Sequence, residues 1–402
     1  MMAFPVKWYS NAMQGAPSLG DTAPGALAAL LKACLITGFG NLTVSSLAWD
    51  AAMGCAVATI DSGHSYLPES VIAISGATPA AYNGEHRVKQ VNATKVWFEL
   101  DGGNPGSNAT GTISIKIPGL GWTLLAESAD GQTMIIRSPE SVDQYPVCYH
   151  IDNSAFSGWT HASNYYYFAK VSMVEDVQDL TTFTLINMQA WPATKRYSDG
   201  RWDLFGDNLL FYFVPAYASR NGRSCLAAGY INSVRPGDRY HAVLAGIINN
   251  IGATNAISWT SNTAPSGNGN NFVMGDFLAH GATANRILAR PHSQLFGAIS
   301  WQTIGLFSRM GAGLAVPNPA DNGFYLAKEP TMVLEGGDTM RGSLPGLINP
   351  YGDITAYDGK TFSDLPLLGV RTVRFIRATY ATNVFSSLAA TLVAFDITGP
   401  WR

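Results

Sequence analysis

The chain has 402 residues, a formal net charge of −3 and 13% charged residues, about half of the ~25% found in average globular proteins. Its 47% hydrophobic and 11% aromatic content excludes an intrinsically disordered chain, because disordered segments are rich in charge and poor in aromatic residues. The length allows two or three domains with substantial cores. The small net charge gives no reason to expect non-specific attraction to nucleic acid.

Lysine and glutamate are scarce, with 9 lysines and 8 glutamates in the whole chain. The buried centres of protein–protein interfaces are depleted in both residues and enriched in arginine and aromatic residues. Two interpretations stay open at this point. In the first, much of the surface faces other subunits, which predicts a homo-oligomer. In the second, the chain is a low-charge β-protein with a surface of Ser, Thr and Asn.

The sequence holds no run of 18 apolar residues, so no membrane-spanning helix is predicted. The first nine residues lack the apolar core of a signal peptide. Four widely spaced cysteines favour buried free thiols over a disulfide framework, which fits synthesis in a reducing cytoplasm. They are Cys34, Cys55, Cys148 and Cys225.

Residues 1–48 are predicted to form an N-terminal arm and an amphipathic helix. Phe4, Trp8 and Tyr9 fit either an arm that reaches onto a neighbouring subunit or an edge strand of the chain's own domain. Asp21 or Thr22 is a candidate helix cap, Pro24 a first-turn residue, and Gly38 the residue after the last turn. An apolar stripe at helical spacing comprises Leu27, Leu30, Leu31, Cys34 and Leu35.

Residues 49–118 are predicted to form a small β-barrel or sandwich. Short alternating runs are separated by turn residues, and Asn83-Gly84 is a tight-turn signal because both residues tolerate positive φ. The joint at Asn92-Ala93-Thr94 separates two of the runs. The predicted strands are Cys55–Ile60, Val71–Ile74, Arg87–Val91, Lys95–Leu100 and Thr112–Ile117.

These residues carry a resemblance. Ser62-Gly63-His64, the run Val71 to Pro79, Tyr82-Asn83-Gly84 and Ala109 to Ile113 resemble a β-module of tailed-bacteriophage virion proteins, one similar in fold to the first catalytic cysteine half-domain of ubiquitin-activating enzymes. The resemblance extends to segments typical of phage tail and baseplate proteins. These segments are Val6–Tyr9, Leu31–Gly40, Arg341–Leu347 and Phe395–Trp401. The resemblance implies a virion structural protein. The likeness to ubiquitin-activating enzymes concerns the fold only, and it implies neither a thioester cysteine nor an adenylation site.

Residues 119–402 are predicted to form a large antiparallel β-sandwich-like domain, entered through a hinge at Pro118-Gly119-Leu120-Gly121. A second break is predicted near 251–274, where Asn, Gly, Ser and Thr indicate a long loop. The spacing of Arg371, Arg374 and Arg377 does not decide between strand and helix. The strand candidates are Met134–Arg137, Tyr145–Ile151, Tyr165–Met173, Phe183–Met188, Leu209–Tyr217, Tyr240–Ile248, Ala298–Trp301, Tyr325–Val333, Val370–Tyr380 and Ala389–Ile397.

No nucleophile elbow, phosphate-binding loop, dinucleotide fingerprint or H-E-x-x-H motif occurs, so no catalytic or cofactor-binding residue is predicted. Cys148, His150 and His161 are the nearest approach to a metal cluster, but a tetrahedral site needs a fourth ligand. A buried thiol and a hydrogen-bonded histidine are the alternative. Gly336-Gly337-Asp338 and Asp321-Asn322-Gly323 offer loop oxygens to calcium without the spacing of a calcium loop, which favours turns.

Two features leave a sugar-directed function open. Asp199, Asp203 and Asp207 surround Trp202 and Phe205 in a loop-like stretch, and glycosidases use paired carboxylates, although aspartate in such loops usually forms turns. The aromatic runs Tyr165–Phe168 and Phe211–Phe213 form sheet faces in a core or, alternatively, a platform for sugars.

We therefore expect a structural component of a phage virion tail, in the baseplate, tail tip or collar. It is expected to self-assemble, to provide docking surface for neighbouring tail or fibre proteins, and to be assembled in the bacterial cytoplasm. The turn Asp101–Asn108 is the segment expected to meet a partner. The alternatives are host attachment through glycans, with Tyr166 or Trp202 stacking on sugars, and a polysaccharide depolymerase using Asp199 and Asp203. No metal or cofactor is expected.

Overall fold

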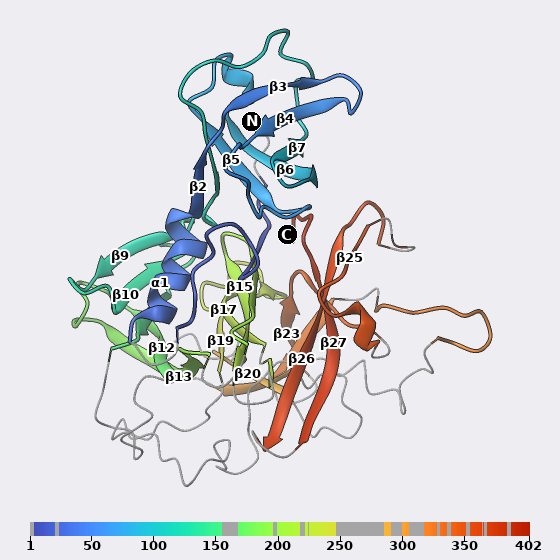
Figure 1. Cartoon of the computed structure of the whole chain (residues 1–402). Helices are drawn as coiled ribbons and strands as arrows, with labels where there is room; N and C mark the ends of the chain where they lie inside the picture. Colours follow the sequence, from blue (N-terminus) through green and yellow to red (C-terminus); the bar gives the residue numbers. More distant parts are fainter. Residues whose placement is uncertain are drawn as a thin grey trace.

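The computed structural model describes residues 4–20, 24–154, 168–195, 199–217, 222–223, 225–246, 285–290, 300–304, 317–327, 330–335, 339–350, 354–363, 365, 368–383 and 387–402. In this part of the chain the protein is mainly β, with one short α-helix and four antiparallel sheets (Figure 1). The predicted mainly β fold class, with an N-terminal helix, is confirmed.

The helix begins later than predicted. α1 (Ala26–Lys32) has Gly25 at its N-cap. The candidate caps Asp21 and Thr22 lie outside the described residues. A π-helical turn, Ala33–Thr37, follows and ends at Gly38, whose φ of 72° suits glycine. The missing cap comes from a distant residue, because the Asn153 side-chain oxygen accepts a hydrogen bond from the Leu27 amide at 2.9 Å. The predicted apolar stripe is confirmed, and all five of its side chains are fully buried.

A seven-stranded sheet stands at the top of the molecule in Figure 1. We call it, with its connections, the β-module (residues 39–117). It begins ahead of the predicted boundary at residue 49, because its first strand pairs with its last. Its strand order is β2-β8-β5-β6-β7-β4-β3. The strands are β2 (Phe39–Thr43), β3 (Ser46–Asp50), β4 (Cys55–Thr59), β5 (Val71–Ser75), β6 (Gly84–Val91), β7 (Lys95–Phe98) and β8 (Ser114–Ile117).

One predicted turn of the β-module is wrong. Ile74 of β5 pairs with Gly84 of β6, so Asn83-Gly84 is not a two-residue hairpin and Gly84 opens a strand. The longer connection contains a 3-10 turn, Ala80–Tyr82, and the Asn83 amide closes it by bonding the backbone N–H and C=O of Ala77. The predicted joint between β6 and β7 is present, with Asn92 Oδ1 accepting hydrogen bonds from the amides of Thr94 and Lys95.

The second large unit has three layers, which lie from left to right below the β-module in Figure 1. The left layer is a five-stranded sheet in the order β13-β12-β11-β10-β9. Its strands are β9 (Thr123–Glu127), β10 (Thr133–Arg137), β11 (Cys148–Asp152), β12 (Phe168–Glu175) and β13 (Thr184–Pro192).

The central layer is an eleven-stranded sheet in the order β1-β14-β15-β17-β19-β20-β21-β22-β23-β18, with β16 paired to β15. β18 follows β17 after one residue and pairs with β23, so the run from β17 to β23 returns to the segment that continues β17. Its strands are β1 (Lys7–Ser10), β14 (Trp202–Gly206), β15 (Leu210–Tyr217), β16 (Gly222–Arg223), β17 (Leu226–Tyr230), β18 (Asn232–Ser233), β19 (Ala242–Ala245), β20 (Asn285–Ala289), β21 (Ser300–Ile304), β22 (Thr331–Glu335) and β23 (Thr339–Leu344).

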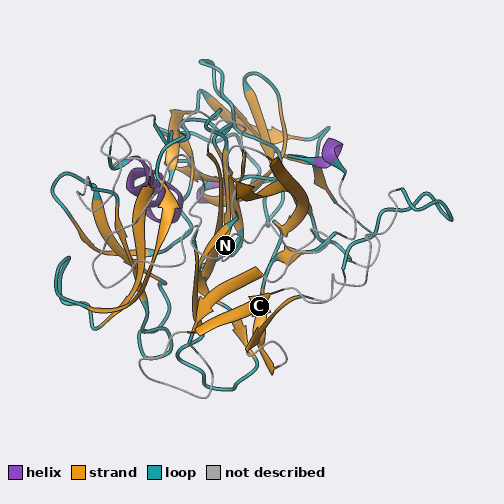
Figure 2. Cartoon of the chain, turned by 90° about the horizontal axis from the view of Figure 1, so that it is seen from below, coloured by secondary structure: helices purple, strands orange, loops and turns teal. Residues whose placement is uncertain are grey.

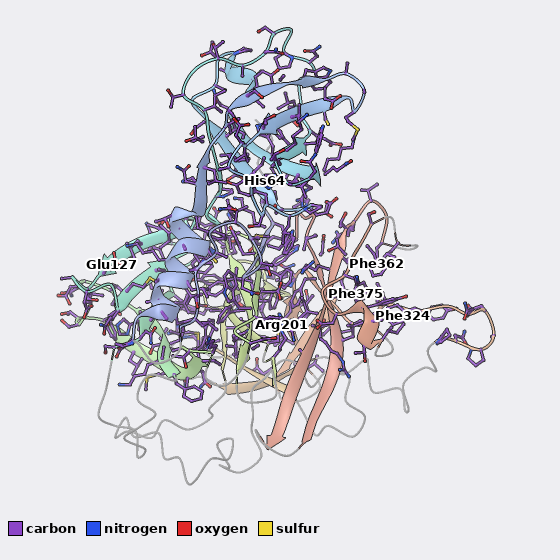
Figure 3. All side chains as sticks on the ribbon, viewed as in Figure 1. His64, Glu127, Arg201, Phe324, Phe362 and Phe375 are labelled. Carbon is purple, nitrogen blue, oxygen red and sulfur yellow. The ribbon has the colours of Figure 1, made fainter. Side chains whose placement is uncertain are left out.

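The right layer is a four-stranded sheet in the order β24-β27-β26-β25. Figure 2 shows the whole chain from below, with the strands in orange and the helices in purple. β26 carries Arg374 and Arg377, so their three-residue spacing belongs to a strand. Phe324, Phe362 and Phe375 form a small aromatic cluster on this layer (Figure 3). The strands are β24 (Leu347–Ile348), β25 (Thr361–Phe362), β26 (Val373–Asn383) and β27 (Ser387–Asp396), and a 3-10 turn covers Thr355–Tyr357.

β15 shows why the central layer is buried on both faces. Side chains alternate across a strand, so Phe211 and Phe213 meet Trp191 of the five-stranded sheet. Between them, Tyr212 points the other way and contacts Phe395 of β27, with the ring centroids 5.2 Å apart. The continuous apolar run of β15 is therefore the sequence of a strand covered on two sides.

Candidate interaction site

The first strand joins the β-module to the central layer. β1 pairs with β14, which makes it the edge strand of the chain's own central sheet. Its side chains reach into the β-module: Trp8 Nε1 donates to the Glu69 carbonyl at 2.9 Å, and Lys7 Nζ lies 3.0 Å from a Glu85 carboxylate oxygen. One short strand thus belongs to the central sheet through its backbone and contacts the β-module through its side chains.

The segment predicted as a hinge after the β-module is hydrogen-bonded to the end of the helix. The amides of Leu120 and Trp122 donate to the carbonyls of Cys34 and Leu35 at 2.9 and 3.0 Å, which ties this segment to the end of the helix. The Tyr9 hydroxyl also donates to the Pro118 carbonyl at 3.1 Å. A side chain at Gly119 would meet the Ile36 carbonyl oxygen, so this close approach requires glycine. The β-module is held at several points.

The loop of the β-module that was expected to meet a partner is exposed. Most of Asp101–Asn108 is open to solvent, and the loop lies in the teal part of Figure 1 at the top of the molecule. Its ends are fixed, because the Tyr82 hydroxyl donates to the Ser107 carbonyl at 3.0 Å and the Ala109 amide donates to the Leu47 carbonyl at 2.8 Å. An exposed loop on a fixed base is a suitable contact element.

The predicted carboxylate group does not form an acid pair. The stretch around Trp202 is the buried strand β14, and the prediction of a loop is wrong. Asp203 pairs with the buried Arg223, with Arg374 Nε 3.7 Å away. Asp207 pairs with Arg402 at 3.0 Å, and its Oδ1 accepts hydrogen bonds from two backbone amides. Asp199 bonds Arg201, labelled in Figure 3, at 2.6 Å. Each of the three carboxylates is thus bound to an arginine.

The cysteine and histidine on β11 face an apolar cluster. The Cys148 thiol is buried among Ile135 and Val174, and burial raises its pKa to about 11. His150 packs on Phe183, its buried Nε2 has no hydrogen-bond partner, and burial lowers its pKa. The predicted buried thiol is confirmed, but the hydrogen bond predicted for the histidine is not found at Nε2. His161 lies outside the described residues. All four cysteines are free and buried.

The proposed metal loops have separate outcomes. Asp321 Oδ1 accepts a hydrogen bond from the Gly323 amide at 2.9 Å, and Asn322 has a φ of 58°, which confirms the turn. Gly336, Gly337 and Asp338 lie outside the described residues. Within the described ranges, no group of three or more metal-ligating side chains comes together.

The aromatic run Phe211–Phe213 lies in the core. Phe211, Tyr212 and Phe213 are at most 1% exposed, and Trp202 is fully buried with its Nε1 donating to the Pro17 carbonyl at 2.9 Å. None of these rings can stack on a sugar. Tyr165, Tyr166 and Tyr167 lie outside the described residues, and the same holds for the whole of the predicted loop 251–274.

A polar cavity that the sequence did not predict lies where β17 continues into β18. It has a volume of about 490 Å³, and its lining includes Tyr145, Arg235, Arg239, His241 and Arg402. These residues come from a loop before β11, the connection between β18 and β19, and the end of the chain. Because they are distant in sequence and share no motif spacing, no sequence signal could have grouped them.

The chain matches no family model and no curated protein. Among the residues that the structure describes, no helix has the length and apolar character needed to cross a membrane.

Proposed function

We propose that this chain is a structural component of a tailed-phage virion, in the baseplate, tail tip or collar, which self-assembles and docks neighbouring tail or fibre proteins. The observation that carries the proposal is the β-module, which stands at one end of the molecule, is bonded to the rest of the chain through Trp8, Tyr9 and Leu120, and presents the exposed loop Asp101–Asn108. The resemblance of its residues to phage virion modules supports the same assignment.

The distribution of charge supports self-assembly. Few residues are charged, and several of those are buried in ion pairs, including Arg223, Arg290 and Arg341 at 4% exposure or less. The outer surface is therefore lower in charge than the composition alone indicates. Low-charge surface with exposed apolar residues is characteristic of a protein that buries part of its surface against other subunits.

The outer edge of the five-stranded sheet is a candidate contact between subunits. In the described part of the chain β9 pairs only with β10, so it is the edge strand of this sheet. Leu125 on this strand is 40% exposed. An open edge strand with an exposed apolar side chain is a template for pairing with another chain.

The oligomeric state of the full chain tests the proposal. Size-exclusion chromatography with light scattering is expected to give an oligomer for the natural chain and a smaller species for Leu125→Glu. Val370→Glu is the matched control, because Val370 is 86% exposed but lies away from the five-stranded sheet. A natural chain that stays monomeric at high concentration and is absent from virions by mass spectrometry would overturn the proposal.

The proposal involves no catalytic step. The aspartates predicted for a depolymerase are bound to arginines, so that alternative has lost its proposed site. Release of reducing ends from a host capsule or lipopolysaccharide by the purified chain would contradict the non-enzymatic assignment.

A further inference from the structure

A loop of the five-stranded sheet covers part of the sheet's own outer face. It joins β12 to β13 and comprises residues 176–183, and we call it the covering loop. The side chains beneath it come from β10, β11 and β12 and are Ile135, Cys148 and Val174. The loop side chains packed against them are Val177, Leu180 and Phe183. Because Ile135 and Val174 are fully buried and Cys148 is 6% exposed, the loop shields an apolar face of the sheet from water.

His150 lies under the covering loop. It is opposite Ile135 in the pairing of β10 with β11, so both side chains are on the covered face. Its ring packs on Phe183 with the ring centroids 4.9 Å apart. The buried Nε2 has no hydrogen-bond partner in the protein. A neutral ring is tolerated in such a place, whereas an imidazolium would bring a charge and a second N–H donor into an apolar contact.

Charged groups on three strands surround this part of the sheet. Burial is the main cause that lowers the pKa of His150; Asp152 of the same strand opposes the shift, and Lys170 of β12, which is opposite Asp152, adds to it. Arg137 of β10 and Glu175 of β12 are the charged groups beside the covered thiol. The net effect of these surroundings is to disfavour the protonated ring as long as the loop covers it.

The covering loop itself carries two aspartates, and its turn keeps its hydrogen bonds in mild acid. Asp179 Oδ1 accepts hydrogen bonds from the amides of Thr181 and Thr182 at 2.7 and 2.8 Å, and such bonds lower the pKa of this carboxyl to about 2. Asp176 Oδ2 accepts a hydrogen bond from the Thr184 hydroxyl at 3.2 Å, where β13 begins. Near pH 5 the Asp179 turn is therefore retained, so the loop moves as one unit.

We propose that the covering loop is a pH-sensitive lid, which leaves the sheet when His150 is protonated and uncovers the apolar face around Cys148. With the loop lifted, the ring meets water, where a histidine has its ordinary pKa of about 6.5. Because the covered ring has the lower pKa, protons bind the open form more tightly. The loop is therefore closed above pH ~6.5 and opens progressively as the pH falls below that value. The inference stands on this loop alone and holds whether or not the chain is a virion protein.

Labelling of the four free cysteines in the full chain tests the lid. Dithiodipyridine reacts with thiols in acid as well as at neutral pH, and peptide mass mapping gives the rate at each cysteine. Between pH 7.5 and pH 5 the rate at Cys148, divided by the rate of glutathione at the same pH, is expected to rise at least about fivefold. Cys34, Cys55 and Cys225 are buried elsewhere and report global unfolding, so their relative rates are expected to stay unchanged.

Two pairs of variants assign the effect. His150→Leu keeps an apolar side chain under Phe183 and cannot take up a proton, so its relative Cys148 rate is expected to be independent of pH. His64→Gln is the matched control, because it removes a histidine of the β-module whose pKa burial also lowers, and it is expected to keep the rise. Phe183→Ala is expected to raise the Cys148 rate at pH 7.5 at least about fivefold. Leu185→Ala, at a 54% exposed position of the same hairpin, is expected to leave it unchanged.

Hydrogen exchange on the natural chain at the same two pH values, corrected for the intrinsic exchange rate, keeps the test independent of the variants. Faster exchange at pH 5 in peptides that cover residues 176–183, together with the selective rise at Cys148, supports the proposal. An unchanged Cys148 rate, an equal rise at all four cysteines, a rise that persists in His150→Leu, equal rates in Phe183→Ala and Leu185→Ala, or unchanged exchange in the loop overturns it.

Discussion

The β-module and the three-layered unit bury apolar surface in different ways. In the β-module, β8 alternates between partly and fully buried residues, so one face of the strand meets the core. In the three-layered unit, β14 and β17 are buried at every position. A sheet covered on both faces has no solvent for its polar groups, so any charge it contains needs a partner inside. The buried arginine pairs are found in this unit for that reason, at Arg223, Arg290 and Arg341.

The largest expected effect is on the ion pair between Arg341 and Asp238, whose side chains are 1% and 3% exposed. Arg341→Met leaves a buried carboxylate without its cation, which we expect to cost about 3–5 kcal/mol in the free energy of unfolding. Denaturant unfolding measures this loss. Arg201→Met is the matched control, because Arg201 is 45% exposed and its surface pair contributes less than about 1 kcal/mol.

A second variant distinguishes the stability cost of an unpaired buried charge from the cost of lost packing. Adding Asp238→Asn to Arg341→Met removes the stranded charge, so part of the stability is expected to return. If Arg341→Met is no more destabilising than Arg201→Met, the buried pair does not distinguish the two regions as described.

The second largest expected effect is a dependence of the unfolding free energy on pH, caused by His241 in the three-layered unit. Burial is the main cause that lowers the pKa of His241 to about 4; Asp238 opposes the shift, and Arg341 and Arg402 favour it. In the unfolded chain histidine has a pKa of about 6.5. Because the folded pKa is lower, the stabilisation is fully present above pH ~6.5 and is lost as the pH falls towards about 4, by up to roughly 3 kcal/mol.

Denaturant unfolding between pH 7 and pH 4.5 measures this dependence, and the comparison with His241→Gln isolates it from other histidines. Burial also lowers the pKa values of His64, His86 and His150. The natural chain is expected to lose more stability on acidification than the variant. Parallel curves for the two proteins would show that His241 titrates normally in the folded chain.

The difference between the two regions also explains what the sequence could predict. The strands that begin at Lys95 and end at Ile117 are predicted correctly because one-sided burial leaves an alternating pattern, and the helix is predicted correctly from its apolar stripe. β14 was predicted as a loop, because Asp203 and Asp207 are turn formers in most sequences. Their arginine partners lie at residues 223 and 402, and no local sequence pattern indicates such distant pairs.

The contacts that define the architecture are equally distant in sequence. β1 pairs with β14, and Asn153 caps the helix that begins at Ala26. Such pairings depend on tertiary packing, which propensity and periodicity do not encode. The cavity could not be predicted for the same reason, since its lining extends from Gln144 to Arg402.

Asn153 is the third test, and it concerns a link between the helix and the five-stranded sheet. Its side-chain oxygen bonds the Leu27 amide, and its backbone carbonyl accepts a hydrogen bond from the Gly25 amide at 3.1 Å. Asn153→Ala removes only the side-chain contact and is expected to cost about 1–2 kcal/mol in unfolding free energy. Asn153→Asp keeps the acceptor and is expected to lose less. Equal losses would mean that the cavity left by the side chain, and not the cap, sets the cost.

The smallest effect on stability is expected in the loop of the β-module. Asn104 is exposed, and its Oδ1 accepts a hydrogen bond from the Gly106 amide at 2.9 Å within the same loop. Asn104→Ala is therefore expected to change the unfolding free energy by less than about 0.5 kcal/mol. If the loop docks a neighbouring protein, incorporation of the variant into virions, measured by mass spectrometry, falls although folding is intact, while Lys89→Ala incorporates normally. A large loss of stability in Asn104→Ala would instead assign the loop to the packing of the β-module and remove it as the docking element.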